Sequence, residues 1–151
     1  MKALALIFSL LLLGGCAGGL SIDRQHPSAN HDSRVQWVVV HYTSTDVQHS
    51  LELLTRGGVS SHYLIGEAPA TIYQLVDENR RAWHAGDSQW RGRTWLNAST
   101  LGIELVNQGY ADTPAGRVWQ PYSEAQIDAL ILLLKDIVQR HHLPIDSIIG
   151  H

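Results

Sequence analysis

The chain has 151 residues, a formal net charge of −3 and 44% hydrophobic residues. This length and hydrophobic content suffice for one compact domain with its own core, and the slightly acidic balance excludes a basic surface for nucleic-acid phosphates. Nine histidines favour a metal or acid–base site, because neutral imidazole binds transition metals and titrates near neutral pH.

The N-terminal segment has the pattern of a bacterial signal peptide. A positively charged start precedes an apolar run, residues 3–13, that is too short to cross a bilayer as a mature helix. The following Gly14-Gly15-Cys16 resembles the lipoprotein box, in which the cysteine is acylated and the chain is cut before it. We therefore expect a signal peptide at residues 1–15 and a lipid anchor on Cys16, with an ordinary secretory signal and a chance cysteine as the alternative.

Cys16 is also the single cysteine of the chain. The mature protein therefore has no internal disulfide, no cysteine nucleophile and no thiolate ligand, so a metal must be held by histidine and carboxylate. Residues 16–33 are polar and predict a tether between the lipid and the domain. Ala17, in place of the aspartate that retains lipoproteins at the inner membrane, favours the outer membrane and a periplasmic location.

The first half of the domain expected at residues 34–151 alternates strands with one helix. Residues 35–42 are β-branched and aromatic, which is typical of a strand buried on both faces. Thr45 or Asp46 can cap a helix that Gly57-Gly58 ends. Two neighbouring strands are expected at 62–65 and 71–76, and residues 77–97 show no sustained period, which predicts an irregular surface where a binding groove could form.

The second half adds two strands and a long helix. Residues 101–106 form an apolar run around one carboxylate, and 147–150 begin a last strand. Ser123 with Gln126 makes a capping box for a helix that reaches His142. These elements predict an α/β fold in which helices flank a single mixed β-sheet.

Three titratable residues, His41, Glu104 and His151, stand within or at the ends of these apolar strands. Burying an unpartnered polar group costs roughly 1–3 kcal/mol, and a lone carboxylate costs more, so each side chain needs a compensating neighbour. A shared metal would supply one. For any single histidine, the simpler interpretation is a hydrogen-bonded core residue.

A series of motifs resembles the zinc-dependent N-acetylmuramoyl-L-alanine amidases of the second type, a family that includes phage amidases and peptidoglycan recognition proteins. The motifs run in the family's order from residue 35 to 151 and comprise Val40-His41-Tyr42-Thr43, Ser60-Ser61-His62-Tyr63-Leu64-Ile65, Ala82-Trp83-His84-Ala85-Gly86, Asn97 with Ser99-Thr100-Leu101-Gly102-Ile103-Glu104-Leu105, and Ile148-Ile149-Gly150-His151. Together with the lipoprotein box, they resemble most the amidases anchored in the bacterial outer envelope.

The resemblance implies the peptidoglycan-recognition-like fold and hydrolysis of the amide between N-acetylmuramic acid and L-alanine of peptidoglycan. His41 and His151 match the family's two zinc-binding imidazoles, and Glu104 matches the carboxylate that acts as the base. His62 is expected in the core or behind the ligands rather than as a direct zinc ligand, and it is counted with Trp83 and His84 among the substrate-binding residues. His84 with Trp83 resembles a stretch that lines the substrate groove, and a lid over the core is the alternative for the tryptophan.

The family pattern continues beyond the second imidazole to an aspartate or cysteine that completes the zinc site. We therefore expect this sequence to be a C-terminally truncated copy or a fragment. One competing hypothesis is a peptidoglycan-binding module that does not hydrolyse. Another is a structural envelope lipoprotein without a metal, in which His41, Glu104 and His151 would lie far apart.

Overall fold

The computed structural model describes residues 21–151, and Asp32–His151 form one folded unit. Residues 21–31, in the other unit, contain no helix or strand and are exposed. The predicted signal peptide and Cys16 lie outside the described residues. In the described part of the chain, neither helix combines the length and hydrophobicity that crossing a bilayer requires.

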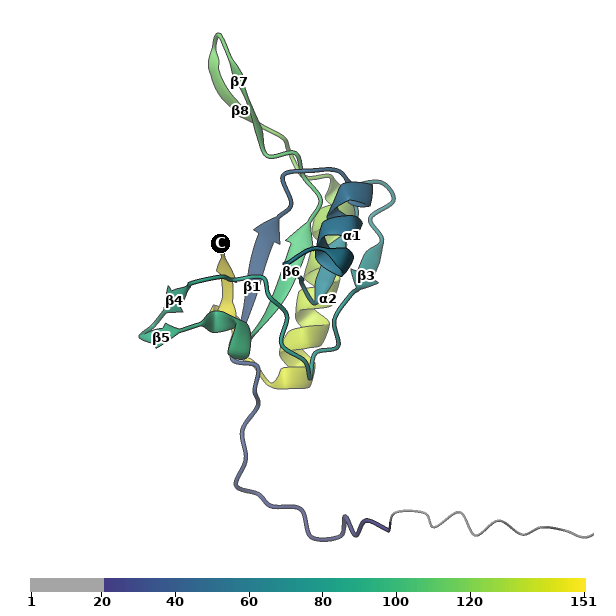
Figure 1. The fold of residues 1–151 in the computed structure, drawn as a ribbon, viewed down its shortest axis with the longest axis vertical. Helices are drawn as coiled ribbons and strands as arrows, with labels where there is room; N and C mark the ends of the chain where they lie inside the picture. The colour runs from purple at the N-terminus through teal and green to yellow at the C-terminus, as the bar shows by residue number, and fades with distance from the viewer. Residues whose placement is uncertain (1–20) are drawn as a thin grey trace, which may run out of the picture. The chain divides into compact units, whose positions relative to one another are not determined.

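A five-stranded mixed sheet forms the centre of the domain, in the order β3-β2-β6-β1-β9 (Figure 1). Its strands are β1 (Trp37–Tyr42), β2 (Tyr63–Ile65), β3 (Ile72–Gln74), β6 (Thr100–Leu105) and β9 (Ile148–Gly150). β2, β6, β1 and β9 run parallel, and β3 is antiparallel to β2. The predicted mixed sheet, including its local β2–β3 hairpin, is therefore confirmed.

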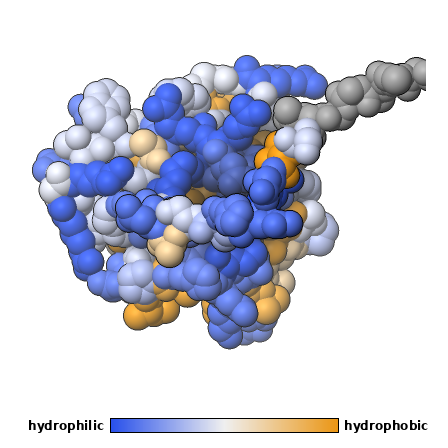
Figure 2. Space-filling model, turned by 90° about the horizontal axis from the view of Figure 1, so that it is seen from below, coloured by the Kyte–Doolittle hydropathy of each residue, from blue (hydrophilic) through white to orange (hydrophobic). Residues whose placement is uncertain are grey.

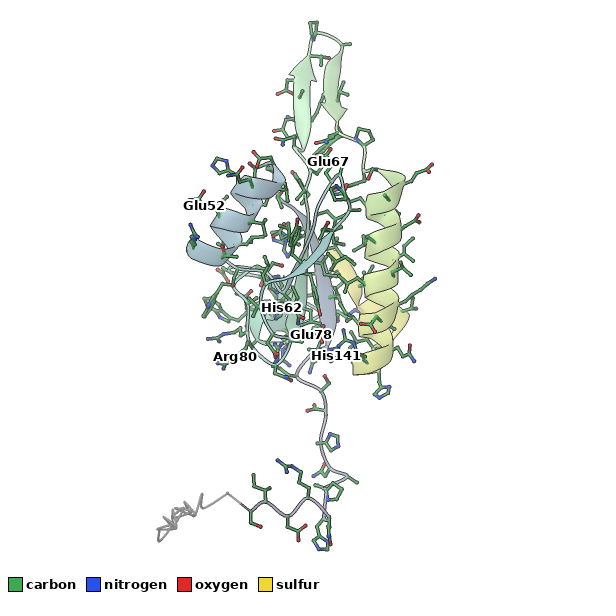
Figure 3. All side chains as sticks on the ribbon, turned by 90° about the vertical axis from the view of Figure 1, so that its right-hand side faces the viewer. Glu52, His62, Glu67, Glu78, Arg80 and His141 are labelled. Atoms are coloured by element: carbon green, nitrogen blue, oxygen red, sulfur yellow. The ribbon has the colours of Figure 1, made fainter. Side chains whose placement is uncertain are left out.

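Two helices cover opposite faces of the sheet, as the side view of Figure 3 shows. They are α1 (Val47–Arg56) and α2 (Glu124–His141). α2 contributes Leu133 and Ile137 to the larger core cluster, against alternate residues of β1, β2 and β6. α1 contributes Leu54 to a smaller cluster with Leu64 and Val106. The central strands are thus buried on both sides, which explains their mainly apolar sequences.

Both helices begin at the predicted caps. Asp46 accepts a hydrogen bond from the His49 backbone N–H, and Ser123 accepts one from that of Gln126, so each satisfies an otherwise free helix donor. The Gln126 side chain is buried and donates to the carbonyl of Val106 at 2.7 Å. The start of α2 is thereby tied to the end of β6.

Two short hairpins depart from the predicted elements. The segment expected to be irregular contains β4 (Gln89–Trp90), β5 (Arg93–Thr94) and a 3-10 turn, η1 (Leu96–Ala98), but is otherwise without strands. The hairpin of β7 (Tyr110–Thr113) and β8 (Gly116–Trp119) was not predicted. All eight of its strand residues are exposed, and it projects from the upper end of the sheet in Figure 1.

The far end of α2 is fixed by one carboxylate, Glu78, which lies in the loop after β3. Glu78 accepts hydrogen bonds from Tyr63 at 2.6 Å, from His141 at 2.7 Å and from two nitrogens of Arg140. Figure 3 shows Glu78 and His141 between the sheet and α2.

A second 3-10 turn, η2 (Ile145–Ser147), connects α2 to β9. Seen from below, the surface is mostly hydrophilic, with hydrophobic residues in separate small areas (Figure 2).

Candidate active site

Three adjacent parallel strands carry the predicted site residues on one face of the sheet. His41, near the end of β1, is paired in register with Glu104 of β6. Residues in register on parallel neighbours point to the same face. On the other side of β1, the His151 backbone N–H donates to the carbonyl of Val40 at 3.1 Å, and the rings of His41 and His151 lie 4.8 Å apart between centroids. This proximity contradicts the hypothesis of a structural lipoprotein with dispersed side chains.

His84 reaches the same face from the loop before β4. Its Nδ1 lies 3.0 Å from Nε2 of His41, and its Nε2 lies 3.1 Å from the hydroxyl of Thr100. The ring rests directly on Gly102, where a Cβ atom would come 2.4 Å from Cγ of His84. Asn97 holds the loop by accepting hydrogen bonds from the backbone N–H groups of His84 and Ala85.

Substrate contact by His84 stays a prediction, and the structure describes the surroundings of its ring. Both ring nitrogens face protein atoms, one on His41 and one on Thr100. Sequence reasoning could place His84 near the groove, but not against His41, because the seat on Gly102 exists only once β6 is folded under the loop.

His62 is fully buried, and its contact with substrate stays a prediction. Its Nε2 donates to the carbonyl of Arg80 at 3.1 Å, and its Nδ1 accepts from the backbone N–H of Gly102 at 2.9 Å. Figure 3 shows the side chain inside the domain, near Arg80. The core role that sequence favoured for His62 agrees with this position, since a buried imidazole with two main-chain partners locks the loop onto the sheet.

Burial keeps the rings of His41 and His84 neutral. Burial, and second the neighbouring charge of His151, lowers the pKa of His41 to about 4. Burial, and second the charge of His41, lowers the pKa of His84 to about 3. Neutral imidazoles retain a lone pair, which is the form that binds metal ions.

Glu104 has the opposite response to the same surroundings. Burial raises its pKa to about 7, and its Oε2 is buried without a hydrogen-bond partner. A carboxylate in this state is suited to accept a proton near neutral pH. It lines a hollow of about 130 Å³ together with Tyr42, Thr43 and residues of α1.

A second hollow, of about 230 Å³, lies on the His151 side of the site. Trp90, Gln89 and Ser88 line it with His151. Trp83 is half exposed, and the guanidinium of Arg81 lies 4.3 Å from the centre of its ring. Substrate contact by Trp83 stays a prediction.

The paired rings of His41 and His151, beside the unpartnered oxygen of Glu104, fit part of a catalytic zinc site. Such sites use three protein ligands and leave one position open. Within residues 21–151, no group of three or more histidine, cysteine, aspartate or glutamate side chains is arranged to hold a metal. The described residues therefore offer two candidate ligands and a candidate base.

The comparisons with known proteins agree with this geometry. Residues 31–151 match the sequence model of the family N-acetylmuramoyl-L-alanine amidase. The chain is 40% identical to the N-acetylmuramoyl-L-alanine amidase AmiD of Escherichia coli K12 over 160 aligned positions, covering 97% of this chain and 58% of the relative. A putative amidase of Rickettsia conorii, RC0497, is 30% identical over 69% of this chain and 36% of its own length.

Solved structures show the same fold. The complex of E. coli AmiD with anhydro-N-acetylmuramic acid-L-Ala-D-gamma-Glu-L-Lys superposes with a TM-score of 0.80, covering 89% of this chain and 55% of that one, at 40% identity. AmpDh3 from Pseudomonas aeruginosa, in complex with anhydromuramic pentapeptide, gives 0.77 at 35% identity, covering 88% and 57%. The chain thus spans little more than half the length of these relatives. Its sequence matches and its fold show that the chain belongs to the type 2 N-acetylmuramoyl-L-alanine amidase family.

Proposed function

We propose that the protein hydrolyses the amide bond between N-acetylmuramic acid and L-alanine in peptidoglycan, with zinc as cofactor. The observation that carries this proposal is the placement of Glu104. Its buried, unpartnered oxygen lies on the same sheet face as His41, in the adjacent strand and in register with it. Family membership supports the reaction, and this geometry supports Glu104 as the base and His41 with His151 as metal ligands.

In this proposal His41 and His151 hold the metal through ring nitrogens. When bound, zinc polarises the amide carbonyl and lowers the pKa of a coordinated water. Glu104 accepts the proton of the attacking water and transfers it to the departing alanine nitrogen, which makes the amine a leaving group. The low dielectric that raises the pKa of Glu104 also strengthens its interaction with charge that develops during the reaction.

The substrate class is supported by two relatives that were solved with anhydromuramyl peptides. Trp90, beside His151, and the half-exposed Trp83 are proposed to contact the sugar, because aromatic faces offer broad apolar contact. His84 supports the ligand His41 from behind and does not contact substrate in this proposal.

We further propose that the protein is an outer-membrane lipoprotein. It is anchored in the membrane through Cys16, and its domain faces the periplasm. The support is the sequence pattern around Cys16 and the polar residues that follow it. In that location the enzyme would meet peptidoglycan and its turnover products, which suits cell-wall degradation or recycling.

The test compares the purified protein with three variants on an anhydromuramyl peptide. Glu104→Gln should retain bound zinc and lose at least about 100-fold in stem-peptide release, because a positioned base contributes about 100- to 10,000-fold. His41→Ala should lose the metal itself. Glu52→Gln, an exposed carboxylate change on α1 (Figure 3), is the matched control and should match the parent in both measurements. Parental activity in Glu104→Gln, or full zinc in His41→Ala, would contradict the assignments.

A second candidate is a peptidoglycan-binding protein that does not hydrolyse. The observation in its favour is that two imidazoles, not three donors, are available within the described residues, since both nitrogens of His84 are already hydrogen-bonded. Muropeptide binding by the parent protein without any release of stem peptide, at saturating zinc, would select this candidate.

A further inference from the structure

A chain of hydrogen bonds leads from the main chain to the proposed ligand His41. The hydroxyl of Thr100 lies 2.8 Å from the carbonyl oxygen of Leu96 and 3.1 Å from Nε2 of His84. Nδ1 of His84 lies 3.0 Å from Nε2 of His41. Thr100 is fully buried, so no solvent competes for its hydroxyl.

The donor and acceptor of each hydrogen bond follow from the carbonyl group at the start of this chain of bonds. A carbonyl oxygen can only accept, so the single hydroxyl proton of Thr100 is donated to Leu96. The oxygen of Thr100 then accepts from His84, which places the ring proton of His84 on Nε2. Because the neutral ring has only one N–H, Nδ1 of His84 is an acceptor, and the proton between the two rings belongs to Nε2 of His41.

From this polarity we infer that Thr100 and His84 are positioning residues that fix His41 as the Nε2–H tautomer and leave Nδ1 as its metal-binding nitrogen. The metal part of this inference rests on the proposed function, but the tautomer does not. The same contacts hold the plane of the His41 ring, since rotating it by 180° would put a carbon where Nε2 now faces His84.

The loop is built to keep His84 in this place. Gly102 leaves room for its ring, and Asn97 anchors its backbone. Hydrogen-bond partners behind metal-binding histidines commonly set the tautomer and raise metal affinity. Here the partner is a second imidazole, whose own tautomer is set by a hydroxyl that the main chain has oriented.

Long-range 1H–15N NMR of the imidazole rings, recorded on the metal-free protein, tests the inference directly. We expect His41 and His84 to show the Nε2–H pattern. His62 is an internal reference, because its contacts with Arg80 and Gly102 also require Nε2–H. A wild-type His41 that carries its proton on Nδ1 would overturn the inference.

Two pairs of variants separate positioning from simple packing. Thr100→Val should let His84 move its proton to Nδ1 and donate to His41, which then becomes Nδ1–H, whereas Thr100→Ser should keep the wild-type pattern. His84→Asn retains an acceptor near Nδ1 and should preserve the His41 tautomer, whereas His84→Gln retains only the group near Nε2 and should not. If Thr100→Val folds and His41 keeps its Nε2–H pattern, the inferred chain of hydrogen bonds is refuted. If Thr100→Val does not fold, the tautomer of His41 in His84→Gln is the test.

Adding Zn²⁺ to the same samples tests the metal-binding nitrogen. We expect the Nδ1 resonance of His41 to shift while its Nε2–H persists, and zinc affinity to fall about 10- to 100-fold in Thr100→Val, the usual effect of losing such a partner. Coordination through Nε2 of His41 would refute the inference. Zinc that shifts neither nitrogen would refute the zinc site of the proposed function, and the metal-free tautomers would still test the inferred chain of hydrogen bonds.

Discussion

A single methyl group added at Gly102 should destabilise the sheet. In Gly102→Ala the new Cβ would lie 2.4 Å from Cγ of His84, whereas ordinary contact begins near 3.4 Å. The His84 ring must therefore retreat by about 1 Å, which stretches its 3.0 Å contact with His41 beyond hydrogen-bond range. We expect a loss of about 1–3 kcal/mol in the free energy of unfolding, typical of overpacking.

Urea unfolding of Gly102→Ala and of a matched Gly58→Ala control measures this loss. A Cβ on Gly58 would meet nothing within 4 Å, so its free energy of unfolding should change by less than about 0.5 kcal/mol. The cause is identified by repeating Gly102→Ala in a His84→Ala background, where the clashing ring is absent. If the methyl group is as destabilising there as in the parent, the proposed contact between Gly102 and His84 is not its cause.

Three further predictions concern other parts of the chain. Burial alone would raise the pKa of Glu78, but hydrogen bonds from Arg140, and then from Tyr63 and His141, lower it to about 2. Because this pKa is below the value in the unfolded chain, the ionised Glu78 stabilises the fold fully above about pH 5, and this stabilisation is lost as the pH falls toward 2. Glu78→Gln should therefore cost about 2 kcal/mol at neutral pH, discounted for the exposure of Arg140, and the difference from wild type should vanish near pH 2 in acid unfolding curves. Cys16→Ser should abolish labelling by a radioactive fatty acid, and label on that variant would refute the anchor. Trp119→Ala, on the exposed β7–β8 hairpin, should leave the free energy of unfolding within about 0.5 kcal/mol, and a larger loss in urea unfolding would show that the hairpin belongs to the core.

The sheet could be predicted because its strands are buried on both faces. Residues 35–42 and 101–106 are almost wholly apolar, and such runs have few alternatives to a central parallel strand. The capped helices were equally visible, since Asp46 and Ser123 form the bonds that their sequence context indicates. These features depend on neighbours within a few residues along the chain.

The β7–β8 hairpin escaped prediction because its strands bury nothing. Without a buried face, residues 110–119 show no clear period, and only the turn residues Pro114 and Gly116 offer a local signal. The relation between His84 and His41 escaped for another reason. It depends on a loop crossing β6 at its one glycine, and no sequence pattern around His84 contains that information.

The position of β9 at the edge of the sheet affects how firmly His151 is held in the site. Within residues 21–151 this strand has one neighbour, β1, and it is only partly buried. Edge strands with few partners open at lower free energy than the sheet they join. Fraying of β9 would withdraw His151 while His41, His84 and Glu104 keep their places on the inner strands. A ligand that binds both His41 and His151 would hold β9 against β1. Amide hydrogen exchange along Ile148–Gly150 should therefore slow when such a ligand binds, and it should slow more there than anywhere else in the sheet.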